Sequence, residues 1–168
     1  TIKQTKKVNP ECTVEVLTPD FKGFEPALKI VFDSKPDIFS HNVECVERIS
    51  KAVRAQANWQ RSLGVLEKSI QHGLRTKTGI MVGLGEEVEE VKKTMRQVVD
   101  LGVQIFTIGQ YLQPTKNHLK VEEYISKEQF ELYKEYGYSI GFKVVESGPL
   151  VRSSYHADEQ ARMVFNNG

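Results

Sequence analysis

The chain has 168 residues, among them 23 Lys plus Arg, 22 Asp plus Glu and two cysteines, and its net charge is +1. With 39% apolar and 27% charged residues it is typical of one globular domain, and the near-neutral charge argues against nucleic acid or an anionic membrane as a partner bound through bulk charge. No apolar run approaches the roughly 18 residues of a membrane span. Two cysteines, Cys12 and Cys45, are too few for a disulfide scaffold or a four-thiolate metal site, and this low cysteine count favours a reducing, cytoplasmic compartment.

The start of the chain has the pattern of a helix end. Ile2, Thr5 and Val8 recur at helical spacing, and the pattern stops before Pro10. Because the chain begins inside this pattern and without a Met, we expect it to be a piece of a longer protein.

Short β-rich runs alternate with longer segments of helical period along the rest of the chain. The β-rich runs predict five strands, at about residues 14–17, 38–41, 78–82, 103–108 and 143–146. The helical segments predict helices from about residue 24, over 44–53, from 59 to before 73, over 88–101, from 127 to 140, and again in the polar tail after 151. Asn58 is a predicted N-cap, and Ser126 with Gln129 forms a predicted capping box.

Strands that alternate with helices of this length predict a parallel α/β sheet, either doubly wound or part of a (β/α) barrel. The barrel is favoured because polar residues follow the strand ends, as on the active face of such barrels. These residues are Thr18, Asp20, His41, Asn42, Glu44, Gly83, Glu86, Gln110, Gln113 and Arg152. Five strands cannot close a barrel of eight, so we predict a partial TIM-like barrel over residues 1–150, truncated at its N-terminal side, and a C-terminal tail over 151–168. Its open edges need the missing N-terminal part or a partner to cover them.

Two loops that follow strands each allow a structural and a functional interpretation. Loop 83–86 (GLGE) lacks the third glycine of a dinucleotide fingerprint, so it is either a tight turn or a backbone that a ligand approaches closely. Asn42 and Glu44 either cap the next helix or hydrogen-bond ribose hydroxyls or an amino group. His41 between them and the strand is interpreted as a packing histidine.

Further polar residues near the strand ends leave the same choice open. Gln110 either orients a substrate or belongs to a strand exit, and Arg54 and Arg61 either contact substrate at the rim or form surface salt bridges. Segment 152–157 (RSSYHA) brings Ser and His within three positions, but without a G-x-S-x-G elbow it argues against a hydrolase.

Six segments in order, over nearly the whole chain, resemble the lipoyl synthases, a family of radical S-adenosylmethionine enzymes. They are residues 15–23 (EVLTPDFKG), 36–44 (PDIFSHNVE), 60–63 (QRSL), 79–86 (GIMVGLGE), 107–114 (TIGQYLQP) and 147–157 (SGPLVRSSYHA). The resemblance implies a partial barrel with two 4Fe–4S clusters and S-adenosylmethionine. One cluster cleaves S-adenosylmethionine to a radical that removes hydrogens from an octanoyl chain on a carrier protein, and an auxiliary cluster supplies two sulfur atoms.

The resemblance also implies site residues. The family's strand motif beside the adenine of S-adenosylmethionine is matched by Gly79, Met81, Gly83 and Glu86. Asn42 and Glu44 would face the ribose or methionine part of the same ligand. The family's auxiliary cluster has three cysteines and one serine, which we place at Ser154, with Ser153 as the alternative; the harder oxygen ligand suits an iron that the cluster releases.

The resemblance further implies partners and a location. The partners are an octanoylated lipoyl-carrier protein, an electron donor and the missing N-terminal part of the barrel, without nucleic acid or membrane. The compartment is the cytoplasm, or the mitochondrion or plastid in a eukaryote.

One departure from the family is large, because its cluster cysteines come in two triplets and this chain contains neither. We therefore expect the chain alone to bind no complete cluster and to be inactive, with no catalytic residue of its own. Two other interpretations stay open: a non-catalytic half-barrel that scaffolds a partner, and a phosphate- or sugar-binding β/α enzyme that uses the 83–86 loop.

Overall fold

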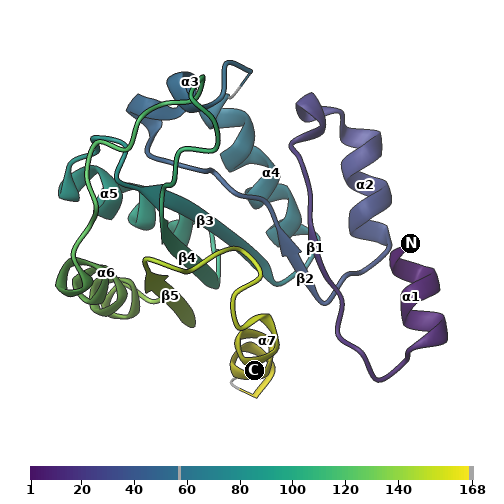
Figure 1. Cartoon of the computed structure of the whole chain (residues 1–168). Helices are drawn as coiled ribbons and strands as arrows, with labels where there is room; N and C mark the ends of the chain where they lie inside the picture. The colour runs from purple at the N-terminus through teal and green to yellow at the C-terminus, as the bar shows by residue number, and fades with distance from the viewer. Residues whose placement is uncertain (57, 167–168) are drawn as a thin grey trace.

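The computed structural model describes residues 1–56 and 58–166, and its centre is a parallel sheet whose five strands lie side by side in chain order (Figure 1). The strands are β1 (Glu15–Leu17), β2 (Ile38–Ser40), β3 (Thr76–Val82), β4 (Ile105–Gln110) and β5 (Val144–Gly148). This arrangement confirms the predicted fold class, a partial parallel α/β barrel. The last two residues of the predicted tail lie outside the described residues.

Each strand is followed by helical structure. The helices are α1 (Ile2–Val8), η1 (Phe21–Gly23), α2 (Glu25–Asp33), η2 (Glu47–Ile49), α3 (Ser50–Val53), α4 (Trp59–Gln71), α5 (Val88–Asp100), α6 (Lys127–Ser139) and α7 (Ala157–Asn166), of which η1 and η2 are 3₁₀ turns. The predicted helix at the start is confirmed as α1, which lies at the edge of the molecule (Figure 1). Among the described helices, none is long and apolar enough to cross a membrane.

The outer face of the sheet is buried under α4, α5 and α6. Leu66, Met95 and Phe130 come from these three helices and belong to one apolar cluster with Phe106 and Ile108 of β4. All five side chains are at most 1% exposed. This cluster is the main hydrophobic core, and its burial is the dominant favourable contribution to folding.

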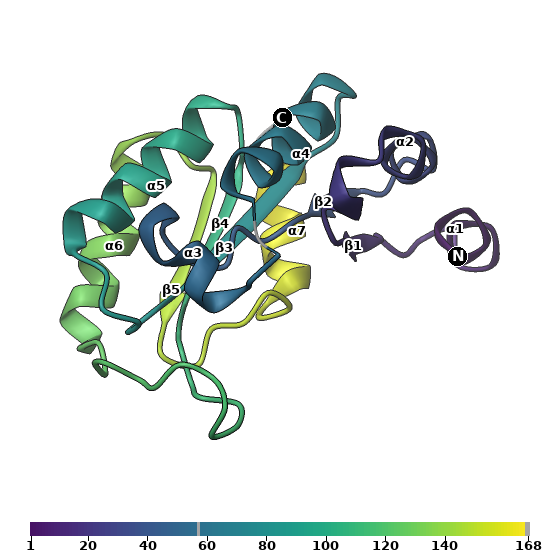
Figure 2. The same ribbon diagram turned by 90° about the horizontal axis from the view of Figure 1, so that it is seen from above.

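Helix α7 covers the inner face at its lower end, where the strands begin. Ala161 and Val164 of α7 pack against Ile38, Ile105 and Val144, which are the first residues of their strands. Because successive side chains of a strand point to opposite faces, α7 lies opposite α5 and α6, as Figure 2 shows. Helix α7 therefore does not cover the inner face near the carboxyl ends of the strands.

The predicted helix starts are largely confirmed. The Asn58 side chain accepts a hydrogen bond from the backbone of the first turn of α4. Ser126 likewise accepts one from the Gln129 backbone at 3.1 Å. The complete reciprocal capping box lies elsewhere, between Glu87 and Glu90 at the start of α5, within the acidic segment that precedes that helix.

The prediction of a helix over residues 44–53 is wrong for its first turn. Glu44 forms a parallel bridge with Ile80, in which the Glu44 N–H donates to Gly79 O at 3.1 Å and the Met81 N–H donates to Glu44 O at 2.8 Å. These bonds tie Glu44 to β3 and keep it out of a helix, so that only the short η2 and α3 follow. The β4 strand also lies two residues later than predicted, because its register pairs Gln110 with Val82.

The core assignment predicts unequal costs for two truncations. Leu66→Ala should lower the free energy of unfolding by about 2–5 kcal/mol, because it leaves a cavity under the sheet. Ile30→Ala on α2, where the side chain is 69% exposed, should change it by less than about 0.5 kcal/mol. Urea denaturation of both variants measures the difference, and equal losses would contradict the assignment.

Candidate functional site

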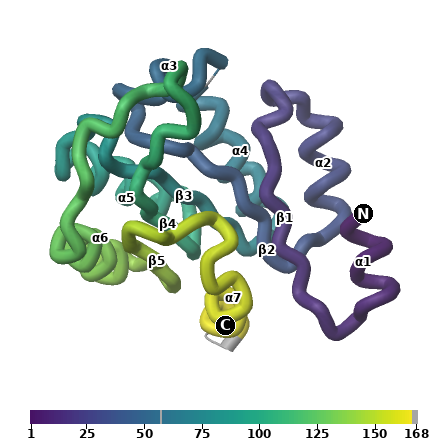
Figure 3. Tube along the Cα trace, viewed as in Figure 1, coloured from purple at the N-terminus to yellow at the C-terminus, as the bar shows by residue number. Residues whose placement is uncertain are grey.

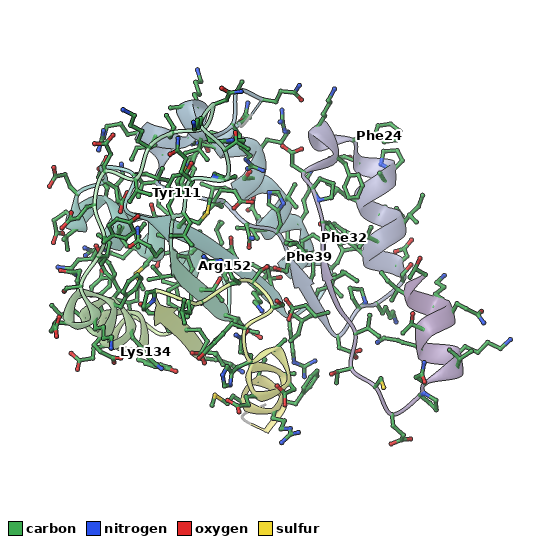
Figure 4. The ribbon with its side chains drawn as sticks, in the orientation of Figure 1. Phe24, Phe32, Phe39, Tyr111, Lys134 and Arg152 are labelled. Atoms are coloured by element: carbon green, nitrogen blue, oxygen red, sulfur yellow. The ribbon has the colours of Figure 1, made fainter. Side chains whose placement is uncertain are left out.

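A cavity of about 190 Å³ lies on the inner face, near the carboxyl ends of β2, β3 and β4. It is lined by Asn42, Glu44, Gly79, Ile80, Met81, Thr107, Gly109, Val151, Arg152 and Ser153. The last three belong to the segment between β5 and α7, which crosses in front of the sheet (Figure 3) and carries Arg152 (Figure 4). Whole small-molecule pockets typically measure about 300–1,000 Å³, so this cavity has room for part of a nucleotide-sized ligand.

A larger cavity, about 500 Å³, lies on the other side of the molecule between α2 and α4. It is lined by exposed helix residues such as Lys29 and Gln71, and none of the predicted site residues reaches it. The inner cavity is the better candidate because four predicted residues, Asn42, Glu44, Gly79 and Met81, converge there.

Glu44 is held in an unusual backbone conformation. Its φ is +74°, in the left-handed region, which costs a non-glycine residue about 1–3 kcal/mol and persists only where the surroundings enforce it. The enforcing contacts are the two hydrogen bonds to β3. Burial raises the pKa of the Glu44 carboxyl, and the Arg54 guanidinium, 4.0 Å from Glu44 Oε1, partly opposes this rise.

Asn42 lines the cavity and carries an unpaired acceptor. Its Oδ1 atom is buried and has no hydrogen-bond partner among the described residues. A buried, unpaired amide oxygen costs free energy, which a ligand hydroxyl or amino group would recover by donating to it. Asn42, Glu44 and Arg54 together present an acceptor, an acid and a cation within one region.

Two glycines let the parts of the site approach closely. A Cβ atom at Gly79 would lie 2.1 Å from Thr107 Oγ1, and a Cβ atom at Gly109 would lie 2.3 Å from Val151 O. Gly109 therefore allows the tail to rest directly on β4. The role of Gly79 is local packing of the strand pair as well as lining of the cavity.

The predicted site residues Gly83 and Glu86 do not line the cavity. The Glu86 carboxylate accepts hydrogen bonds from the backbone N–H groups of Gly83, at 2.6 Å, and Leu84, at 2.9 Å. Gly83 also has a φ of +97° and is crowded by Gln110, whose side chain bonds to the backbone of Glu123. The loop is thus a closed turn, as its structural interpretation expects, and those two N–H groups are already used. The cofactor-binding role of Gly83 and Glu86 stays a prediction.

The two candidate serines differ in position. Ser153 lines the cavity, whereas Ser154 is exposed and is not among the lining residues. The assignment of Ser154 as a metal ligand, with Ser153 as the alternative, stays a prediction.

The described residues contain no group of three or more His, Cys, Asp or Glu that could hold a metal ion. Burial raises the pKa of the Cys45 thiol to about 12, which disfavours the thiolate that metals bind, and Cys12 is exposed. His41 is buried, its Nδ1 lies 2.9 Å from Thr18 O, and burial lowers its pKa, as expected of a packing histidine. The described residues alone therefore do not fit an iron–sulfur cluster.

Neither of the predicted rim arginines lines the cavity, but Arg54 lies 4.0 Å from the lining residue Glu44. Arg61 is committed to Asp20 through an ion pair, with 2.6 Å between Nε and Oδ2, which supports its structural interpretation. Thr107 and Gly109 are lining residues that were not predicted individually. The signal that could have found them is their two-residue spacing on β4, which repeats that of Gly79 and Met81 on β3.

Comparisons with known proteins agree with this arrangement. Residues 1–98 match the model of the Radical SAM superfamily. The chain is 54% identical over 162 residues to a lipoyl synthase of Rubrobacter xylanophilus, which covers 95% of this chain and 50% of the relative. It is 51% identical over 167 residues to a lipoyl synthase of Bacteroides fragilis, covering 99% of this chain and 57% of the relative. The chain thus spans about half the length of the curated relatives it matches.

A solved structure supports the fold. The crystal structure of methylornithine synthase (PylB) superposes on 99% of this chain and 60% of its own, with a TM-score of 0.67 and 10% sequence identity. At that identity the likeness shows the shared fold alone.

The buried position of Glu44 predicts a pH-dependent stability difference. A carboxyl whose pKa is raised in the folded state contributes full stability below its ordinary pKa of 4.5 and loses it as the pH rises through the raised value. Glu44→Gln carries no charge, so it should be more stable than the wild type at pH 7 and should lose this advantage below about pH 4.5.

Glu90→Gln is the control with the opposite sign, because Arg48 lowers the pKa of Glu90 to about 2. It should be less stable than the wild type at pH 7, and the difference should shrink as the pH falls towards that value. Urea midpoints at several pH values measure both variants. The same pH profile for both would refute the role assigned to burial.

Proposed function

This chain belongs to the radical SAM superfamily, and on that premise we propose that its inner cavity binds S-adenosylmethionine as the C-terminal part of a lipoyl synthase. The observation that carries the proposal is the convergence of Asn42, Glu44, Gly79 and Met81 on one cavity. Homology to lipoyl synthases over at least 95% of the chain supports the choice among radical SAM enzymes.

The polar groups in and beside the cavity suit the ligand chemically. S-adenosylmethionine carries an α-ammonium, an α-carboxylate and ribose hydroxyls. The Glu44 carboxylate and the unpaired Asn42 Oδ1 accept hydrogen bonds from the ammonium or hydroxyl groups. Arg54, which lies 4.0 Å from Glu44 Oε1 outside the lining of the cavity, pairs with a carboxylate. Gly79 and Met81 lie on the strand whose motif the family places beside the adenine. The cavity volume of about 190 Å³ corresponds to part of this ligand. The rest of the ligand would be bound by parts of the enzyme that this chain does not include.

In the whole enzyme, an iron–sulfur cluster held outside the described residues would cleave S-adenosylmethionine, which would supply the chemistry that removes hydrogens from an octanoyl chain. The residues described here bind and orient the ligand. On this proposal the whole enzyme would replace two C–H bonds of an octanoyl chain, carried on a lysine of a carrier protein, by C–S bonds. The auxiliary cluster would supply the sulfur, the adenosyl part of S-adenosylmethionine would take up the hydrogens, and a separate donor would supply the electrons that cleave S-adenosylmethionine. We place this reaction in the cytoplasm, or in the mitochondrion or plastid of a eukaryote.

The chain by itself is expected to be inactive, because its described residues do not fit a cluster. The competing phosphate- or sugar-binding function is less well supported. The 83–86 loop on which it depends has two N–H groups occupied by Glu86.

Glu44→Gln should weaken S-adenosylmethionine binding about tenfold or more, because it removes a charged hydrogen-bond acceptor. Isothermal titration calorimetry should be done with this chain and with a full-length lipoyl synthase carrying the equivalent substitution. Glu47→Gln, at an exposed carboxylate three residues later, is the matched control and should bind normally. If both variants bind as the wild type does, the proposed site is incorrect.

The two serines make a second matched pair. In a full-length lipoyl synthase, the equivalent of Ser154→Ala should reduce sulfur insertion more than S-adenosylmethionine cleavage, and the equivalent of Ser153→Ala should do so less. Product analysis by mass spectrometry measures both steps. The reverse ranking would assign the ligand to Ser153, and unchanged sulfur insertion in both variants would exclude the pair.

A further inference from the structure

Lys77 is a charged residue in the middle of the sheet that the proposed binding does not use. Its side chain is 0% exposed. It pairs in register with Ile105, which contacts α7, so Lys77 lies on the inner face between α7 and the cavity. A buried ammonium needs oxygen partners, because an unpaired charge in the interior is strongly destabilising.

Two distant segments supply the partners of this ammonium. The Lys77 Nζ atom lies 2.9 Å from Glu15 Oε1 and 3.2 Å from Oε2, on β1. It also donates a hydrogen bond to the backbone carbonyl of Ser153 at 2.5 Å. The carboxylate and the carbonyl together satisfy a group that has three N–H donors. The chain between β5 and α7 is therefore attached to a charge in the centre of the sheet.

This attachment lies directly beside the cavity. Val151 is buried, and its carbonyl rests against Gly109 at a distance that no other residue would allow. Arg152 and Ser153, the next two residues, line the cavity. The β5 strand and α7 hold the two ends of this segment, and Lys77 holds its middle.

We propose that Lys77 is a positioning residue, whose ion pair with Glu15 holds Arg152 and Ser153 against the ligand cavity. Removal of the ammonium frees the Ser153 carbonyl and lets the segment leave the inner face. The cavity then loses one wall, and ligand affinity falls although no residue that contacts the ligand has changed. The consequence for S-adenosylmethionine rests on the proposed function, whereas the attachment of the segment does not.

The test uses variants that separate attachment from stability. Lys77→Met removes the ammonium but leaves the Glu15 carboxylate, 20% exposed, without its cation. The double variant Lys77→Met/Glu15→Gln removes both charges, so it should unfold at a urea concentration closer to that of the wild type. Ser153→Ala is the matched control, because it alters the same segment but keeps the carbonyl that Lys77 binds.

Amide hydrogen exchange measures the order of the segment between β5 and α7, and it does not require enzyme activity. The Tyr155 N–H donates to Arg152 O at 2.9 Å, and this turn encloses Ser153, whose carbonyl Lys77 binds, so the Tyr155 exchange rate reports whether Lys77 keeps the turn closed. We expect this rate to rise about tenfold in Lys77→Met and in the double variant, with β4 amides unchanged, and to stay as in the wild type in Ser153→Ala. An unchanged Tyr155 rate in the folded double variant would overturn the proposal.

Titration with S-adenosylmethionine tests the consequence for the cavity. Affinity about tenfold weaker in the double variant than in the wild type supports it. Normal affinity together with faster exchange would overturn the link between the segment and the cavity. If the wild type itself does not bind S-adenosylmethionine, the proposed function fails, while the exchange result still decides whether Lys77 holds the segment.

Discussion

The parallel pairing of β3 with β4 is the constraint on which the rest of the molecule depends. Six residue pairs, from Lys77 with Ile105 to Val82 with Gln110, set the register. Because side chains alternate along a strand, this register places Ile80 and Ile108 on the outer face, under the helices. The intervening residues then face inwards together, so the site has to be built on the face that the outer helices do not cover.

The inner face is divided along the strands into three levels of different chemistry. The lowest level is apolar and is covered by α7, which packs on Ile105 and Val144. Lys77 and Glu15 start from the same register rows as Ile105 and Ile38, but the Lys77 ammonium reaches the Ser153 carbonyl, so the buried pair forms the middle level between α7 and the cavity. The upper level is the polar cavity. The C-terminal chain contacts all three levels, so its path over the sheet links the hydrophobic packing at one end to the ligand-binding residues at the other.

One strained residue and one close backbone contact lie at the upper level. Glu44 keeps a left-handed backbone because β3 donates to it and accepts from it, and the same bonds aim the chain along the cavity. Gly109 allows the tail carbonyl to come closer to a strand than any side chain would permit. The pairing of β3 with its neighbours thus supports an arrangement that the residues would not adopt in isolation.

Local features of this protein could be predicted from the sequence because the interactions behind them span few residues. The alternation of strands and helices, the cap at Asn58 and the position of Asn42 and Glu44 after a strand follow from residue spacing and from the common direction of parallel strands. The grouping of Asn42 and Glu44 with Gly79 and Met81 followed from the resemblance. The resemblance to lipoyl synthases depends on the same short segments.

Tertiary structure decided the features that depend on residues far apart in the chain. Lys77 meets Glu15 across 62 residues and Ser153 across 76, and no local pattern encodes those meetings. The tertiary structure also decides that Glu86 closes its own turn and does not line the cavity. Sequence spacing determines which residues share a face, but only the register of the strands and the path of the tail determine which of them touch.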